Sequence, residues 1–434
     1  MKKFFLSKGH NLLIEGVPHK EIFILDDSKS ILFHPSRIKN FKTKLLVSKG
    51  DSVKIGSPLF FDKKNDKILH VSSCSGIVKD IVFGPRRIVE RIEIDNDFKN
   101  DCLEFDLKIT KDNLMQSGLW AYLRQKPFSK IPNFDSMPKS IFISAMPTEP
   151  FAIDNSFLFD QYQHLQNGID CLKSIFECDI NISVSDNTFS FLKNVSFFQF
   201  NKLHPAGNVG IQMHHIDPIK NANDQRWYLS IQDLDRIGSF FSSGKYPNYR
   251  YCSIGGNGFE KPGIYKKIIG TPISSIKQLV VDSNTRIISG DVLNGKEVSA
   301  DSSIDYHDEV LSLIKTSHDK EFLGWLRPGL KKYSLGSTFL SKLFNNTSSI
   351  LTTKKNGSVR SIIPMGAWDN VLPMDILPEF LIKNVLAKDI EMMEKLGIYE
   401  CSPEDFALCS FVCQSKVEVS KIIQDGLDLM EAEG

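Results

Sequence analysis

The pattern of apolar and polar positions changes character along the chain. Between residues 41 and 95, short apolar runs alternate with turn-forming residues and show no helical period, which predicts β-strands. From residue 100 to residue 250, apolar runs alternate instead with amphipathic segments. The run 140–146 precedes a segment with apolar residues at helical spacing, namely Leu165, Ile169, Leu172 and Phe176. Strands that alternate with helices predict a parallel sheet with right-handed crossovers.

Further strands and a second helix complete this α/β region. Strands are predicted at 180–184, 195–200 and 249–254. A second amphipathic helix carries its apolar residues on one face, at Ile231, Leu234, Ile237 and Phe241. We therefore predict that residues 100–254 form a Rossmann-like α/β domain.

The β segment contains two strand-turn units. Gly50 and Gly56 can take the positive φ of tight turns in the first unit, and the second follows at 73–78. Together the two units resemble the halves of a biotinyl/lipoyl-type barrel-sandwich domain. We predict such a domain, with an N-terminal extension, over residues 1–99.

A carrier role for this domain would need a lysine at the tip of its central hairpin. Spacing places the tip near Asn65, and Lys63, Lys64 and Lys67 only flank it. Lysines beside a hairpin turn usually form a solvated edge. A structural role is therefore favoured over a carrier role.

The last two predicted modules are a small β-grasp domain and a helical domain. Residues 255–335 show short strands and glycine turns around one predicted helix, Ser274 to Val280. Beyond residue 335 the chain is interrupted by prolines and ends in a helix that is predicted to start at 402–405, with a cap hydroxyl, a proline and two acids. The expected fold class is α/β multidomain, with modules at 1–99, 100–254, 255–335 and 336–434.

Size and charge narrow the function classes. A chain of 434 residues divides into roughly two to four compact units. Lys plus Arg number 53 against 52 Asp plus Glu, which gives no broad positive surface for nucleic acid or anionic lipid. No run approaches the about 18 apolar residues of a membrane span, so we expect a cytoplasmic protein that reaches a membrane only through a partner. Eight widely spaced cysteines indicate reduced thiols.

Three of these cysteines lie near the C-terminus. Cys401, Cys409 and Cys413 give the spacing C-x7-C-x3-C. A cubane iron-sulfur cluster needs four thiolates, and a zinc site would need a fourth ligand that the neighbouring sequence does not offer. We interpret the three as buried thiols that pack a helix, and predict no metal site.

The loop 203–210 follows a predicted strand and contains His204. Its backbone amides could cradle an anion, but it is no G-x-G-x-x-G loop and no helix is expected directly after it, so a plain turn is favoured. His214 and His215 are expected on a strand, where adjacent side chains point to opposite faces and cannot share one metal ion.

The start of the α/β region lacks a feature that flavin binding requires. A flavin phosphate site needs several glycines for close backbone approach, whereas Gly118 stands alone among bulky residues. Trp120, Tyr122 and Phe128 would obstruct a nucleotide, and Arg124 with Lys126 would leave only a small basic patch. We predict no tightly bound FMN or NADH.

Taken in order, nine stretches resemble the A subunits of sodium-translocating NADH:quinone oxidoreductases, and the resemblance covers essentially the whole chain. They are 7–16, His34-Pro-Ser, 49–56, Ser117-Gly-Leu-Trp120, 124–129, His204-Pro-Ala-Gly207, 286–290, 322–329 and 408–413. The layout also resembles the flavin-bearing NADH subunit of complex I and the C subunit of the Rnf complex. Relative to the Rnf subunit, 362–373 replaces the first cysteine set without a cysteine, and the second set retains Cys409 and Cys413 with Cys401 out of register.

The resemblance implies a role in a six-subunit membrane complex. Such a complex moves electrons from NADH, through flavins and iron-sulfur centres on other subunits, to ubiquinone, and couples this to sodium export. Its A subunit is implied to be peripheral, on the cytoplasmic face of the bacterial inner membrane, without a cofactor, docked chiefly on the membrane B subunit and associated with quinone reduction. Gln414 replaces the family's usual proline, and 416–420 lacks the usual aromatic, which suggests a structural role for the terminal motif.

Two sets of residues are candidates for contacts within that role. Quinones favour an apolar slot with one or two hydrogen-bond donors, which His204 with Phe198 and Phe200 would supply. Docking is predicted at an apolar turn, Trp325, Leu326 and Pro328, because interface cores favour aromatic side chains. No catalytic acid or base is predicted. Two alternatives remain open: an Rnf-like electron-transfer subunit with its own flavin and iron-sulfur cluster, and a purely structural adaptor without a ligand.

Overall fold

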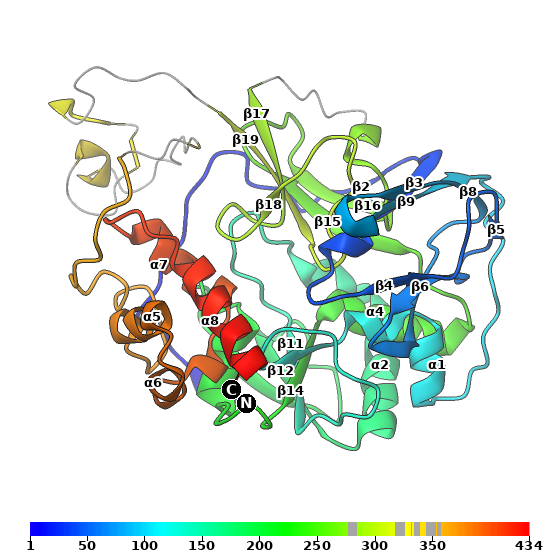
Figure 1. Ribbon diagram of the computed structural model, residues 1–434, viewed down its shortest axis with the longest axis horizontal. Helices are drawn as coiled ribbons and strands as arrows, with labels where there is room; N and C mark the ends of the chain where they lie inside the picture. Colours follow the sequence, from blue (N-terminus) through cyan, green and yellow to red (C-terminus); the bar gives the residue numbers. More distant parts are fainter. Residues whose placement is uncertain are drawn as a thin grey trace.

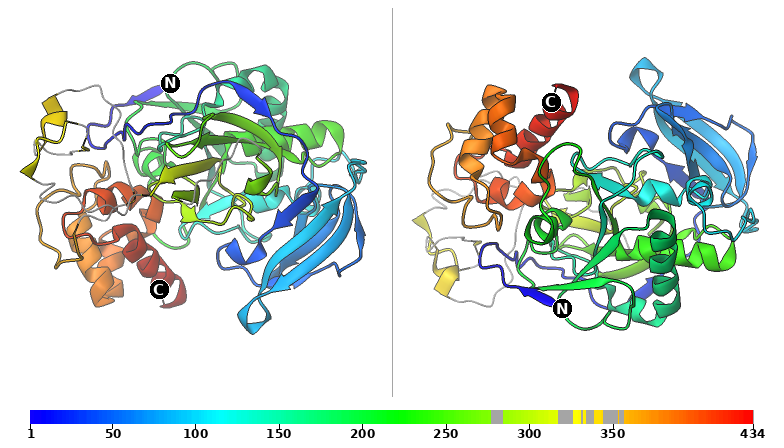
Figure 2. Two further views of the ribbon diagram at one scale, coloured as in Figure 1. Left: turned by 90° about the horizontal axis from the view of Figure 1, so that it is seen from above. Right: turned by 90° about the horizontal axis from the view of Figure 1, so that it is seen from below.

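The protein is a set of four β-sheets joined by helices (Figure 1). The computed structural model describes residues 1–276, 284–316, 326–330, 332–333, 339–343, 353 and 357–433. The N-terminal β-sandwich and the C-terminal helices flank the central sheets (Figure 2). Within the described residues, no helix is both long enough and apolar enough to cross a membrane.

Two small antiparallel sheets build the β-sandwich. One has the order β3 (Ser30–Phe33), β9 (Val89–Asn96), β8 (Gly76–Phe83), β5 (Ser52–Val53). The other has the order β4 (Thr43–Leu45), β6 (Pro58–Asp62), β7 (Asn65–Val71). Gly76 allows the close approach of two strands, since a Cβ there would lie 2.0 Å from the Asp95 carbonyl oxygen.

The central hairpin of the sandwich ends in a different turn from the predicted one. Asn65 is buried and is the first residue of β7, and the two-residue turn is formed by Lys63 and Lys64, both exposed. The Asp62 carboxylate fixes this turn by accepting from the Lys64 backbone N–H at 3.1 Å. The prediction that no lysine occupies the tip is therefore wrong.

A mostly parallel six-stranded sheet forms the centre. Its order is β1 (Lys2–Phe4), β13 (Ser196–Phe200), β12 (Asp179–Val184), β11 (Ser140–Ser144), β14 (Arg226–Ser230) and β10 (Arg124–Lys126), of which only β10 is antiparallel to its neighbour. Ile141 and Ile143 point to α2 (Tyr162–Phe176) and α4 (Ile231–Ser243), because successive residues of a strand face opposite sides. Phe142 faces the other side, toward α3 (Val209–Ile216) and the C-terminal helices.

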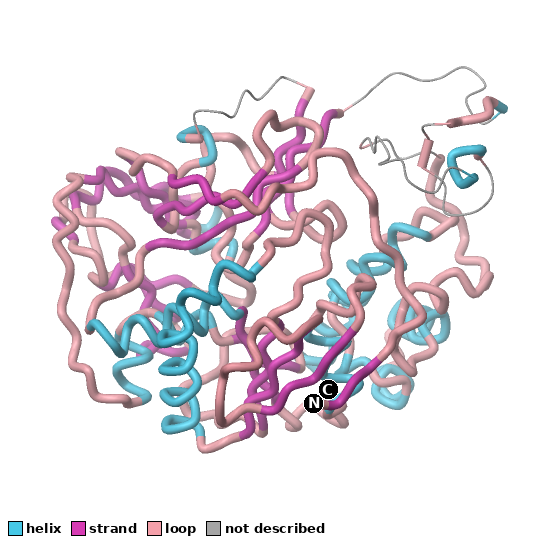
Figure 3. Tube along the Cα trace, turned by 180° about the vertical axis from the view of Figure 1, so that it is seen from behind, coloured by secondary structure: helices cyan, strands magenta, loops and turns pink. Residues whose placement is uncertain are grey.

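A second six-stranded sheet lies beside the first, and Figure 3 separates the two from behind. Its order is β18 (Lys296–Glu297), β17 (Thr285–Ser289), β19 (Val310–Lys315), β15 (Tyr249–Gly255), β16 (Gly263–Ile268) and β2 (Ile22–Ile24). The predicted strand 249–254 therefore exists as β15, but its expected place in the parallel sheet is wrong, since it pairs with β16 and β19. Of the predicted helix 274–280, Ile273–Ser275 forms a 3-10 turn, η5, and 277–280 lies outside the described residues.

The C-terminal region is helical, with an end that differs from the prediction. It comprises α5 (Pro378–Ala387), α6 (Ile390–Lys395), η8 (Ile398–Glu400), η9 (Pro403–Phe406), α7 (Ala407–Val412) and α8 (Val419–Glu433). The helix predicted from Ser402 is thus two helices, α7 and α8, entered through a 3-10 turn. Ser402 does not cap it by accepting from a backbone N–H, because its hydroxyl donates to the Asp405 carboxylate at 2.5 Å.

The remaining elements are short connections. They are η1 (Pro35–Arg37), η2 (Pro85–Arg87), α1 (Lys111–Gln116), η3 (Leu119–Tyr122), η4 (Asn155–Gln161) and η7 (Leu340–Leu343).

Candidate functional site

The stretch where a flavin loop was sought is part of the hydrophobic core. Trp120 in η3 is fully buried, and its indole N–H donates to the Pro132 carbonyl at 2.9 Å. Its ring packs edge-on against Trp227, with 5.4 Å between centroids, and against Phe176 at 5.7 Å. Gly118 has φ of +78°, and a Cβ there would lie 2.9 Å from the Val71 side chain. Aromatic side chains thus occupy the position where a flavin loop was sought, and Gly118 allows the close approach of Val71.

Tyr122 connects the central sheet to the second six-stranded sheet. Its ring stacks on Tyr306 with 4.4 Å between centroids and lies 4.1 Å from the Arg236 guanidinium. Asp233 binds two buried arginines, Arg236 at 3.2 Å and Arg250 at 3.3 Å. This buried network closes the junction between the two sheets with paired charges and aromatic rings.

The prediction that Arg124 and Lys126 form a basic surface patch is wrong. Lys126 is fully buried, and its ammonium donates to the Ser402 hydroxyl at 2.5 Å and lies 3.4 Å from Asp405 Oδ2. Although burial lowers the pKa of Lys126, the carboxylates of Asp405 and Glu404 raise it above its ordinary value. Arg124 lies over the Tyr228 ring at 4.5 Å. Lys126 therefore holds the C-terminal helices on the central sheet and presents no surface to an anion, whereas Arg124 is half-buried and its Nε has no partner.

The residues predicted to contact quinone lie at one edge of the central sheet, but only Phe198 borders a described cavity. That cavity is an open depression of about 550 Å³ between the start of β1 and the 186–190 loop. Its lining is Met1, Lys2, Val184, Asp186, Asn187, Ser190, Val195, Ser196, Phe197 and Phe198. Phe200 is buried and stacks on Phe4 at 4.9 Å.

His204 is buried in its loop. Its Nδ1 bonds the Thr148 hydroxyl at 3.2 Å, its Nε2 has no partner, and burial lowers its pKa to about 4. The loop amides already have protein acceptors: the Ala206 N–H donates to the Leu203 carbonyl at 2.8 Å, and the Gly207 N–H donates to Thr148 Oγ1 at 2.9 Å. The plain-turn interpretation fits these bonds. The expectation that no helix follows at once is wrong, since α3 begins at Val209.

His214 and His215 lie in α3, so their predicted place on a strand is wrong. His214 Nδ1 is 2.6 Å from Glu400, and its Nε2 accepts from the Asp375 backbone N–H at 2.9 Å. His215 Nε2 bonds the Pro373 carbonyl at 2.8 Å. Both imidazoles therefore fasten the C-terminal region to α3.

The three C-terminal cysteines are buried in the core shared by the central sheet and the C-terminal helices. Burial raises the pKa of Cys401 and that of Cys409 above the ordinary range of a thiol. Within the part of the chain that the structure describes, no group of three or more His, Cys, Asp or Glu side chains could hold a metal ion. The arrangement suits thiols that pack as small apolar side chains.

The predicted docking turn is only partly described. Trp325 lies outside the described residues. Leu326 is 62% exposed, and Pro328 is also exposed while its carbonyl accepts from the Leu340 N–H at 2.9 Å.

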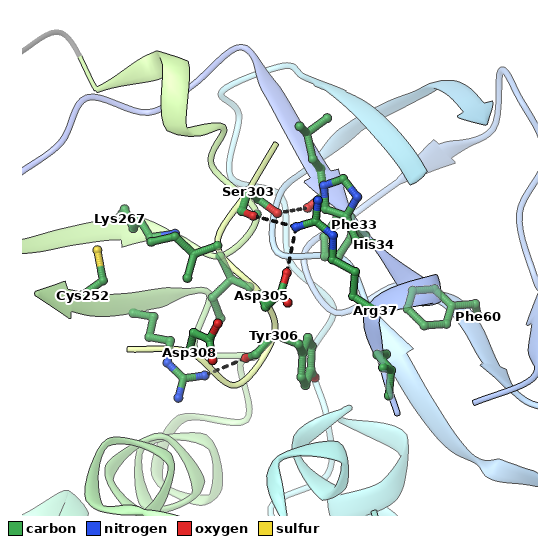
Figure 4. Close-up of a pocket in the computed structure, with 16 residues that line it drawn as sticks. Phe33, His34, Arg37, Phe60, Cys252, Lys267, Ser303, Asp305, Tyr306 and Asp308 are labelled. Carbon is green, nitrogen blue, oxygen red and sulfur yellow. Dashed lines mark hydrogen bonds and ion pairs between the residues drawn. The ribbon is translucent and has the colours of Figure 1, made fainter. Parts of the chain in front are cut away.

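A second, smaller cavity, here called the junction cavity, lies between the β-sandwich and the second six-stranded sheet (Figure 4). Its volume is about 40 Å³, and Arg37, Arg250 and Lys267 are the cationic residues of its lining. Sequence reasoning missed this cavity. The available signal was a basic residue within each of the apolar runs 249–254 and 263–268, because a charge inside a buried strand needs a partner or a ligand.

The fold and these sites define a multidomain α/β protein with a barrel-sandwich module. The family model described as the NqrA N-terminal barrel-sandwich hybrid domain matches residues 4–97, that of the NqrA second alpha/beta domain matches 106–246, and that of the NQRA C-terminal domain matches 252–300. The barrel-sandwich prediction is confirmed.

Full-length relatives identify the family. The chain is 34% identical to the A subunit of the Na(+)-translocating NADH-quinone reductase of Haemophilus influenzae strain PittGG, over 99% of each chain. It is also 34% identical to that of Pseudomonas aeruginosa PAO1 and 33% identical to that of Saccharophagus degradans, again over 99% of each chain. The chain belongs to the family of Na(+)-translocating NADH-quinone reductase A subunits, which confirms the predicted family. A solved NAD+-reducing [NiFe]-hydrogenase covers 42% of this chain and 41% of its own, with a TM-score of 0.33 and 8% identity, which is too distant to bear on the fold.

Proposed function

We propose that this chain is the A subunit of a sodium-translocating NADH:quinone reductase and serves it as a peripheral subunit without a tightly bound redox group. The observation that carries the second part is the packing of Trp120 against Trp227 and Phe176, because these rings fill the place where a flavin loop would need open backbone. The C-terminal region supports it as well, since a cubane cluster needs four thiolates and this region supplies only Cys401, Cys409 and Cys413.

The complex would reduce ubiquinone to ubiquinol with electrons from NADH and export sodium, while flavins and iron-sulfur centres reside on other subunits. This chain would lie on the cytoplasmic face of the inner membrane, attached chiefly to the membrane B subunit of a six-subunit complex. An optical spectrum of the purified chain tests the cofactor statement. A stoichiometric flavin band or a cluster band would instead support an Rnf-like electron-transfer subunit.

For quinone contact, the geometry favours the depression beside Phe198. Its volume is within the range of roughly 300–1,000 Å³ that small-molecule sites occupy. Phe197 and Phe198 supply apolar surface, and Lys2 and Asn187 supply hydrogen-bond donors. Phe200 and His204 would support the lining without touching the quinone, since both are buried and neither lines the depression. The junction cavity, at about 40 Å³, is too small for a quinone ring.

Photo-crosslinking in the assembled complex tests this contact. A ubiquinone analogue with an azide on its ring is expected to label the peptide that contains Phe198, and Phe198→Leu should reduce that labelling. Phe159→Leu is the matched control, because Phe159 is 53% exposed on η4 and does not line the depression. Labelling confined to the B subunit would refute the contact and leave the adaptor role. Labelling at the junction cavity would assign the quinone to another face.

Docking is proposed at the turn of Trp325, Leu326 and Pro328. An exposed leucine beside an exposed proline suits the apolar centre of a subunit interface. Leu326→Asp and Trp325→Asp should each reduce the amount of this chain that copurifies with the membrane subunits. Leu330→Asp is the control, since Leu330 is 55% exposed and lies a few residues beyond the turn. Normal assembly and turnover with both variants at the turn would refute docking there.

A further inference from the structure

The junction cavity brings three buried or partly buried cations together. Arg250 on β15 and Lys267 on β16 are directly opposite each other in the antiparallel pair, so their side chains share one face. Arg37 of η1 reaches the same cavity from the β-sandwich (Figure 4). Like charges opposite each other on neighbouring strands are destabilising unless something compensates for them.

Two of these cations have protein partners. Arg37 binds Asp305 at 2.7 Å and donates to the Ser303 carbonyl at 3.1 Å. Arg250 binds Glu309 at 2.9 Å and Asp233 at 3.3 Å, but its Nε donor has no partner.

Lys267 is different. The residue is only 6% exposed, and its ammonium makes no hydrogen bond or ion pair with any residue that the structure describes. Asp308, the other acid of the lining, accepts from the Ser289 hydroxyl at 2.7 Å. An ammonium in a largely buried side chain without a counter-charge is costly, so either the amine is neutral or an anion completes the site. Burial, and secondarily Arg250, lowers the pKa of Lys267.

The size and shape of the cavity limit the ligand. About 40 Å³ corresponds to roughly three water molecules, since one water needs about 10–15 Å³ of such space. Leu32, Phe33 and Ile304 supply apolar walls, and His34, Ser303 and Tyr306 add polar groups. A ligand of three or four heavy atoms with negatively charged oxygens fits these limits.

We propose that the junction cavity binds a small planar oxyanion, a carboxylate or bicarbonate, with the Lys267 ammonium as its counter-charge and the Arg250 Nε–H as a further donor. The anion would connect the β-sandwich to the second six-stranded sheet, because residues of both line the cavity. This site is separate from the depression beside Phe198, and the proposal does not depend on quinone binding.

The test is a thermal-shift titration of the full chain with formate, acetate and bicarbonate, against chloride and sulfate at equal ionic strength. We expect the three planar oxyanions to raise the melting temperature by a few degrees beyond the chloride and sulfate values. Lys267→Met should weaken their binding at least tenfold in calorimetry. Lys261→Met is the matched control, because Lys261 is exposed just before β16, and it should bind as the unaltered chain does.

A second variant tests the site independently, in case Lys267→Met does not fold. Ile304→Phe keeps every charge but fills the cavity, and it should also lose the oxyanion-dependent shift. Equal shifts with formate and chloride in the unaltered chain, or retained formate binding in both Lys267→Met and Ile304→Phe, would overturn the proposal.

Discussion

The buried ion pair between Lys126 and Asp405 is the contact whose removal should have the largest local effect. Both side chains are at most 1% exposed, and they join β10 of the central sheet to the turn that enters α7. Lys126→Met removes the ammonium and leaves the Asp405 carboxylate buried without a counter-charge. Breaking a buried pair from one side costs about 3–5 kcal/mol.

Hydrogen exchange of the full chain, followed by mass spectrometry, measures this loss as the free energy of opening of α7 and α8. With tenfold for each 1.4 kcal/mol, the cost corresponds to exchange in these helices that is about 150- to 4,000-fold faster. Lys130→Met is a matched control, because Lys130 pairs with Glu431 of α8 across the same interface, with side chains 31% and 25% exposed. A pair of that exposure should be worth under about 1 kcal/mol.

The double variant Lys126→Met, Asp405→Leu separates charge from packing. Replacing both partners with apolar side chains is often neutral, so most of the protection should return. Exchange in Lys126→Met within fivefold of the unaltered chain would refute the reasoning. If α7 and α8 exchange as fast in the double variant as in Lys126→Met, the cost comes from lost packing and not from an unpaired carboxylate.

Three other outcomes are expected. Gly210→Ala should also accelerate exchange of α7, because its Cβ would lie 1.9 Å from Asp405 Oδ2 and 2.7 Å from Lys126 Nζ; unchanged exchange would contradict this. His70 is buried between aromatic rings, and neither ring nitrogen has a hydrogen-bond partner. Burial lowers its pKa to about 3. Its contribution to the stability of the fold is therefore complete above pH 6.5 and is lost as the pH falls toward 3. Chemical denaturation of His70→Phe should therefore show a pH dependence that is flatter by roughly 1.4 kcal/mol per unit between pH 6 and pH 4, and an unchanged slope would refute this. Cys401, Cys409 and Cys413 should react with a thiol reagent only at the rate of opening, whereas Cys102, which is half-buried, should react first; rapid labelling of any of the three would contradict their burial.

The sequence predicted three strands of the central sheet, β11, β12 and β13, and the helices α2 and α4, because their apolar residues recur with clear periods, but it did not predict β1, β10, β14 or α3. Leu165, Ile169 and Leu172 all face the core, as the helical spacing of α2 requires. It could not predict which sheet β15 joins, since Cys252 and Ile254 have the same apolar character in either sheet. Pairing of distant strands depends on tertiary packing, which periodicity does not report.

The candidate sites, too, could be predicted from the sequence only in part. The bulk of Trp120 at the sought flavin loop was visible in the sequence, and the structure has that side chain in the core. The burial of Lys126 was not visible, because its partner Asp405 is 279 residues away along the chain. Lys267 was missed for the same physical reason: whether a lysine is solvated or enclosed is decided by elements that are remote in sequence.

The two N-terminal strands can pair only after distant parts of the chain have been synthesised. Lys2 of β1 pairs with Phe198, and Ile22 of β2 pairs with Ile264. At about 5–20 residues per second, a ribosome needs roughly 10–50 seconds to make the segments between these partners. During that interval the first 25 residues have no sheet to join, although the β-sandwich that follows them is already complete. Residues 1–25 therefore leave the ribosome well before the strands that they pair with, and they can be held by a chaperone, or by a fused tag, for as long as these partners are missing.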